Sequence, residues 1–115
     1  MKMCDVRQLT GAVSCGAAGS ENAEIRSAYA GDLMSDVLAK AGGQDLLITG
    51  LASPQTVHTA QIMEIGAILF VSGKPVDEVT IQLASKYQIT VLITSKSMFE
   101  VCALLYQNGV RPEII

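Results

Sequence analysis

Three short apolar runs recur at regular intervals along the last two thirds of the chain. They span residues 45–49, 67–71 and 89–93, and each is bounded by polar, glycine or turn-forming residues. Each run is too short for a helix and therefore predicts a buried strand. We expect these strands to bury six side chains, namely Leu47, Ile48, Ile68, Phe70, Val91 and Ile93.

Amphipathic segments separate these runs and predict helices. A Ser-Pro pair at 53–54 suits the N-cap and first position of a helix over 54–65. Pro75 opens a second predicted helix, whose apolar stripe extends to Tyr87. A third helix is expected to end before Gly109.

The alternation of strands and helices predicts an α/β fold with three α/β/α layers. Continuous apolar strands joined by helices are typical of a mainly parallel sheet covered on both faces. We assign this core to residues 45–115. The first 44 residues predict helices at 3–9 and 33–41, strands at 12–15 and 25–30, and a glycine-rich loop at 16–22. They are expected to form a small N-terminal subdomain packed on the core.

Composition narrows the partners and the compartment. The chain has 8 Lys and Arg against 11 Asp and Glu, with a net charge of −3 and no basic stripe, so we expect no nucleic-acid partner. No apolar run is long enough to span a membrane. The three cysteines, Cys4, Cys15 and Cys102, are odd in number and widely spaced, which favours free thiols in a reducing cytoplasm. The sequence indicates no metal site and no cofactor.

Polar residues follow each of the three strong strands. In an open parallel sheet, ligands bind outside the carboxyl ends of the strands, where helix N-termini also favour anions. The residues at this edge are Thr49, Gly50, Ser53, Ser72, Gly73, Lys74, Thr94, Ser95 and Lys96. They would suit a phosphate or carboxylate ligand, although helix capping alone also accounts for the hydroxyl side chains. No Walker-type or dinucleotide-binding glycine loop is present.

Two aspartates offer a second candidate site. Asp32 and Asp36 are spaced i, i+4, so a helix would place both carboxylates on one face, with Ser35 between them. A metal-assisted hydrolase or phosphoryl-transfer enzyme could use this pair together with His58, the single histidine. We favour the simpler interpretation, in which Asp32 caps the helix at 33–41 and His58 lies on the surface.

One segment carries a family resemblance. The stretch YAGDLMSDVL at residues 29–38 is followed by Gly42, Gly43 and the strand at 45–49. With the order of the remaining elements, including the final helix, it resembles the DRTGG domain over nearly the whole chain. That family is similar in fold to the N-terminal domain of the HPr kinase/phosphorylase, and also occurs beside CBS pairs in some pyrophosphatases and as stand-alone proteins.

The resemblance implies one domain over residues 1–115 that acts as a regulatory or ligand-binding module without chemistry of its own. Such a module would sense a small anionic metabolite or nucleotide and act through a partner protein. The chain departs from the family at residues 25–29, which read Ile-Arg-Ser-Ala-Tyr and lack the paired glycines of the family name. Any close approach of backbone to ligand at those glycines is therefore in doubt here.

The resemblance and the apolar composition also predict a homodimer. Half of the residues are hydrophobic, and closed two-fold dimers are a common way to cover excess apolar surface. The segment 33–38 has apolar residues on more than one helical face, namely Leu33, Met34, Val37 and Leu38. They would form the dimer contact, unless the N-terminal subdomain buries them within one subunit.

Overall fold

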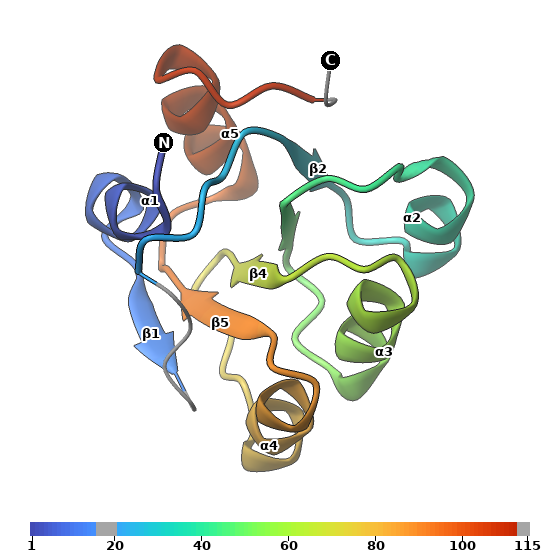
Figure 1. Cartoon of the computed structure of the whole chain (residues 1–115). Coiled ribbons are helices and arrows are strands. Elements are labelled where there is room, and N and C mark those ends of the chain that lie inside the picture. The colour runs from blue at the N-terminus through green and yellow to red at the C-terminus, as the bar shows by residue number, and fades with distance from the viewer. Residues whose placement is uncertain (16–20, 113–115) are drawn as a thin grey trace.

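A computed structural model of the chain describes residues 1–15 and 21–112, and its core is one five-stranded sheet (Figure 1). The strand order is β1-β5-β4-β3-β2. Strands β2 to β5 pair in parallel and β1 pairs antiparallel with β5. The strands are β1 (Val13–Cys15), β2 (Ala28–Ala30), β3 (Leu46–Thr49), β4 (Ala67–Phe70) and β5 (Thr90–Ile93). The α/β fold with a mainly parallel sheet is confirmed.

The N-terminal third contributes the two edges of this sheet. Strand β1 pairs with β5, with Val13 opposite Ile93, and β2 pairs with β3, with Tyr29 opposite Leu47. The first 44 residues therefore contribute strands to the same sheet as residues 45–115. Residues 16–20 of the expected loop at 16–22 lie outside the described residues.

Five helices within the described residues form the outer layers. Figure 1 shows α1 and α5 on one side of the sheet and α2, α3 and α4 on the other. The helices are α1 (Met3–Thr10), α2 (Met34–Lys40), α3 (Pro54–Ile62), α4 (Glu78–Lys86) and α5 (Met98–Gln107). Because β2, β3, β4 and β5 lie in sequence order, right-handed crossovers place their connecting helices α2, α3 and α4 on the same face.

The core consists of two apolar clusters, one on each face of the sheet. Successive strand residues point to opposite faces, so Leu47 and Phe70 pack under the three-helix layer while Ile48 and Leu69 pack under the two-helix layer. Five of the six predicted core side chains are buried. Ile93, at the end of β5, is partly exposed.

Two predicted helix boundaries are wrong. The helix expected from Pro75 begins at Glu78, because Asp77 caps it by accepting hydrogen bonds from the Thr80 backbone N–H at 2.9 Å and hydroxyl at 2.6 Å. These bonds lower the pKa of Asp77. The helix expected over 54–65 ends at Ile62, and Glu64 then takes a left-handed conformation with φ of 57°.

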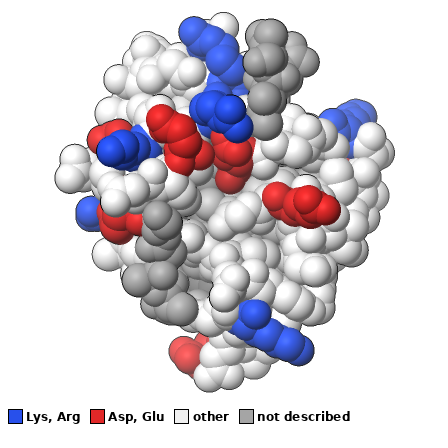
Figure 2. Space-filling model, viewed as in Figure 1, with Lys and Arg blue, Asp and Glu red and all other residues white. Residues whose placement is uncertain are grey.

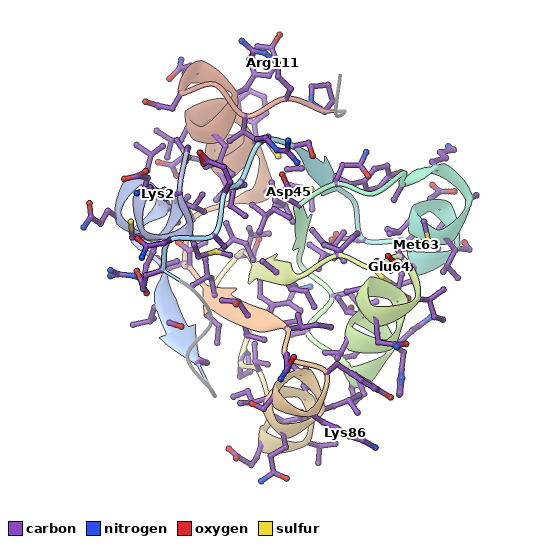
Figure 3. The ribbon with its side chains drawn as sticks, in the orientation of Figure 1. Lys2, Asp45, Met63, Glu64, Lys86 and Arg111 are labelled. Atoms are coloured by element: carbon purple, nitrogen blue, oxygen red, sulfur yellow. The ribbon has the colours of Figure 1, made fainter. Side chains whose placement is uncertain are left out.

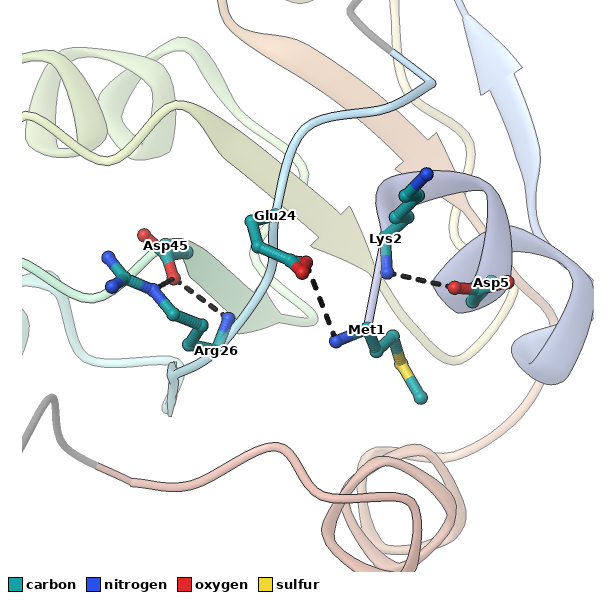
Figure 4. A network of polar contacts seen from close by, with 6 residues as sticks. All are labelled: Met1, Lys2, Asp5, Glu24, Arg26 and Asp45. Atoms are coloured by element: carbon teal, nitrogen blue, oxygen red, sulfur yellow. Dashed lines mark hydrogen bonds and ion pairs between the residues drawn. The ribbon is translucent and has the colours of Figure 1, made fainter.

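A polar network holds the N-terminal segment against the start of β3 (Figure 4). The amino group of Met1 lies 3.7 Å from a Glu24 carboxylate oxygen. The Asp45 carboxylate accepts a hydrogen bond from the Arg26 backbone N–H at 2.8 Å and lies 3.6 Å from the Arg26 side-chain Nε. These contacts fix the segment that leads into the edge strand β2.

Surface charge and thiols agree with the composition. On the face seen in Figure 2, acidic and basic side chains lie next to one another and form no basic stripe. Cys4, Cys15 and Cys102 are free and partly buried. Across residues 1–15 and 21–112, no helix has both the length and the apolar character that crossing a membrane requires.

Candidate functional site at the carboxyl edge of the sheet

The loops that follow β2, β3, β4 and β5 meet at one edge, because these four strands run in parallel. Backbone hydrogen bonds join neighbouring loops. The Val71 N–H donates to the Thr49 carbonyl at 3.0 Å, and the Gly73 N–H donates to the Thr94 carbonyl at 3.0 Å. The edge therefore forms a continuous surface on which the predicted site residues can be compared.

Asp32 binds the end of β3 instead of capping its own helix. Its Oδ1 accepts a hydrogen bond from the Gly50 backbone N–H at 2.7 Å and one from the Thr49 hydroxyl at 3.1 Å. Leu33 is the N-cap residue of α2 and makes no side-chain cap bond. The capping role expected for Asp32 is therefore wrong, because the Gly50 amide after β3 competes for the same carboxylate.

Gly50 also lies beside Lys74. A β-carbon added to Gly50 would be 3.4 Å from Asp32 Oδ1 and 3.7 Å from Lys74 Nζ. No carboxylate of the described residues lies within the 4.0 Å of Lys74 Nζ that an ion pair requires. The loops after β2, β3 and β4 thus bring together a carboxylate, a glycine backbone and an unpaired ammonium group.

The loops after β4 and β5 are tied to each other through their backbone. Ser72 and Gly73 both have left-handed conformations, with φ of 70° and 66°. The Ser72 N–H donates to the Lys96 carbonyl at 2.8 Å, and a β-carbon on Gly73 would be 3.6 Å from Ser95 Cα. These amides are consequently occupied by the protein, while the side chains of Ser72 and Ser95 are exposed.

Two predicted hydroxyl ligands have structural roles. The Thr94 hydroxyl is buried and donates to the Thr10 carbonyl at 2.8 Å, which fastens α1 to the end of β5. The Thr49 hydroxyl donates to Asp32 and accepts from the Leu51 N–H at 3.1 Å. Both side chains shape the edge and are held by these bonds.

Ser53 occupies the N-cap position of α3 without capping it. Its hydroxyl oxygen is buried and has no hydrogen-bond partner among the described residues. By contrast, Ser97 caps α5 by accepting from the Glu100 N–H at 3.2 Å, and Asp77 caps α4. Among the helices that begin at this edge after β3, β4 and β5, α3 alone lacks a side-chain cap within the described residues.

The residues of the metal-assisted alternative do not gather. Ser35 is exposed and Asp36 partly exposed on α2, and His58 is exposed on α3, where its ring lies 6.1 Å from the Tyr87 ring. In the described parts of the chain, no group of three or more His, Cys, Asp or Glu side chains could hold a metal ion. The geometry gives this alternative no support.

The fold has a solved counterpart. The chain is similar to a crystal structure of the CBS and DRTGG domains of the regulatory region of Clostridium perfringens pyrophosphatase, complexed with the activator diadenosine tetraphosphate. The TM-score is 0.71 at 14% identity, and the match covers 92% of this chain and 46% of that chain. The likeness supports a DRTGG-like fold. No protein-family model and no curated protein matches the chain.

One surface feature was missed by sequence reasoning. A groove between β2 and α5 is lined by Ala30, Ile48, Cys102, Leu105, Tyr106 and Arg111, among others. Tyr106 lies near the end of α5, and it is 60% exposed. The signal available in the sequence was an aromatic residue at the end of an apolar helix. The groove, however, exists because β2 is an edge strand, and the sequence does not reveal the order of the strands in the sheet.

Proposed function

We propose that this chain is a non-catalytic regulatory module that binds a nucleotide at the carboxyl edge of its sheet and acts through a partner protein. The observation that carries the proposal is the convergence of Asp32, Gly50 and Lys74. It places one unpaired cation and one partly engaged carboxylate within a few ångströms of the same glycine.

Lys74 supplies the attraction for phosphate. Its ammonium group is exposed and free of ion pairs among the described residues, so binding an anion breaks no existing contact. The N-cap residue of α3, Ser53, lies three residues after Gly50 and does not cap the helix. Helix N-termini favour anions. The buried Ser53 hydroxyl adds a donor at that terminus.

Asp32 determines which kind of anion fits. Its carboxylate already occupies the Gly50 N–H, and its negative charge opposes an isolated phosphate ion. Its Oδ2 accepts no hydrogen bond from a described residue and can accept one from a ligand hydroxyl. A nucleotide offers phosphate to Lys74 and ribose hydroxyls to Asp32, and it therefore suits this pair better than inorganic phosphate.

The non-catalytic part of the proposal rests on how the polar groups are used. The Thr49 and Thr94 hydroxyls are held in structural hydrogen bonds. His58 is exposed on α3, and it belongs to no cluster of described side chains that could hold a metal ion. The solved counterpart comes from a regulatory region in complex with a nucleotide activator, which is in keeping with a regulatory role here.

A homodimer remains part of the proposal, with a smaller contact surface than the sequence suggested. Met34 and Val37 are buried within the subunit, at 2% and 0% exposure, and cannot form a contact between subunits. Leu33 and Leu38 are 60% and 45% exposed. They are the apolar residues of this segment that a second copy could cover.

Thermal unfolding in the presence of ADP, adenosine and inorganic phosphate tests the nucleotide proposal. A ligand at a hundred times its dissociation constant stabilises the folded state by about 2.7 kcal/mol. We expect ADP to raise the melting temperature more than either fragment, and Lys74→Gln to abolish most of that rise. Lys40→Gln is the matched control, because Lys40 lies in the last turn of α2, at the end of that helix away from Asp32. The proposal fails if ADP gives no shift, or if Lys74→Gln and Lys40→Gln respond alike.

A further inference from the structure

A groove lies away from the residues of the carboxyl-edge site. The groove between the edge strand β2 and helix α5 has a volume of about 290 Å³. Ala30, Ile48 and Leu105 contribute to its aliphatic lining, and Cys102 adds a thiol. This volume lies just below the ~300–1,000 Å³ typical of ligand pockets, so a short ligand would fill it.

One cation stands at the rim of this apolar surface. The Arg111 guanidinium lies 4.8 Å from the centre of the Tyr106 ring, just beyond the end of α5 (Figure 3). Its Nη1 approaches the Tyr106 and Val110 carbonyls at 3.4 and 3.5 Å, which are long for hydrogen bonds. No carboxylate of a described residue pairs with it, and none of the described residues that line the groove is acidic.

We propose that this groove binds a short-chain free fatty acid, with its aliphatic chain along the groove and its carboxylate on Arg111. The charge arrangement selects this chemistry. A guanidinium binds a carboxylate with two parallel hydrogen bonds, and stacking on Tyr106 holds its plane in place. The aliphatic walls exclude water from the chain, and the described lining holds no carboxylate that could pair with an ammonium group. The inference is independent of the nucleotide site, with which it shares no lining residue.

Alkylation of Cys102 reports directly on occupancy. Burial raises the pKa of the Cys102 thiol, so its reaction with an uncharged reagent such as N-ethylmaleimide is slow enough to follow by peptide mass spectrometry. We expect hexanoate to slow alkylation of Cys102 in a saturable manner. Hexylamine and hexanol should protect it much less, and Cys4 and Cys15, which do not line the groove, serve as internal controls.

Two variants separate the charge from the cavity. Arg111→Gln should weaken hexanoate protection by about tenfold, since a hydrogen bond to a charged group is lost, while Arg111→Lys should retain part of it. Ala30→Leu should abolish protection by filling the groove. Equal protection by hexanoate and hexylamine, or full protection in Arg111→Gln, would overturn the proposal. Protection that rises with protein concentration alone would also overturn it, because it would show that a second copy covers the groove.

Discussion

The two faces of the sheet are covered to different extents. The face under α2, α3 and α4 has one helix for each crossover between β2 and β5, and its cluster is closed over Leu47, Ile68 and Phe70. Among the described residues, the other face receives two helices, α1, which precedes β1, and α5, which follows β5. With one helix fewer, the surface over β2 is left open, and this is where the groove lies.

The difference shows that strand order alone can produce a cavity. Right-handed crossovers between strands in sequence order place every connecting helix on one face. The opposite face is covered by terminal helices only, so its open end is fixed by topology and not by any single residue. We call the face under α2, α3 and α4 the closed face, and we expect it to respond to mutation as a packed core. We call the face under α1 and α5 the open face, and we expect it to respond as a partly solvated surface.

The largest expected effect is on the closed face. Phe70 is 1% exposed beneath the three-helix layer, so Phe70→Ala should lower the free energy of unfolding by about 3–5 kcal/mol. Urea denaturation measures the change. A midpoint equal to that of the unmodified protein would show that this side chain is not part of the core.

The matching truncation on the open face should cost less. Leu105 is also 1% exposed, but it lines the groove, so the space left by Leu105→Ala opens toward solvent. We expect a loss of about 2–3 kcal/mol, at the lower end of the range for such truncations. If urea denaturation gives a loss equal to that of Phe70→Ala, the two faces are equally well packed and the comparison is wrong.

A smaller effect is expected where the closed face is anchored at its edge. Asp32 joins the loop before α2 to the end of β3 through two hydrogen bonds. Because the side chain is exposed, Asp32→Ala should cost only about 1 kcal/mol in the free energy of unfolding. Asp36→Ala, which removes a carboxylate four residues away on α2, should change stability by less than about 0.5 kcal/mol. Equal losses of unfolding free energy in the two variants would show that Asp32 does not anchor this loop.

The three central strands, β3, β4 and β5, could be predicted from the sequence. The runs at 45–49, 67–71 and 89–93 are continuous and apolar, as buried parallel strands require, and the structure shifts their ends by one residue at most. The start of α4 was harder to predict. Pro75 suggested that the helix begins there, but Asp77 is the N-cap residue, because its carboxylate accepts a hydrogen bond from the Thr80 N–H.

The candidate site could be predicted only in part. Parallel strands bring Asp32, Thr49 and Lys74 to one edge, and the sequence contained the polar residues that follow each strand. It did not show that Asp32 binds the Gly50 N–H, because that contact depends on β2 lying beside β3. The groove was missed for the same reason, since it exists only where β2 is the edge strand.

The smallest expected effect is a gain in stability on the open face. Ala30 is an exposed residue of the edge strand and faces the groove, so Ala30→Val adds apolar surface where space is available. Valine also suits a strand better than alanine, and together these terms should raise the free energy of unfolding by about 0.5 kcal/mol. The matched control is Ala60→Val on α3, whose side chain is 0% exposed in the closed cluster. There the same two methyl groups have no free space and should cost about 1–3 kcal/mol. Urea denaturation of both variants gives opposite signs if one face is open and the other closed, whereas a loss of similar size in both would show that the groove does not accept added volume.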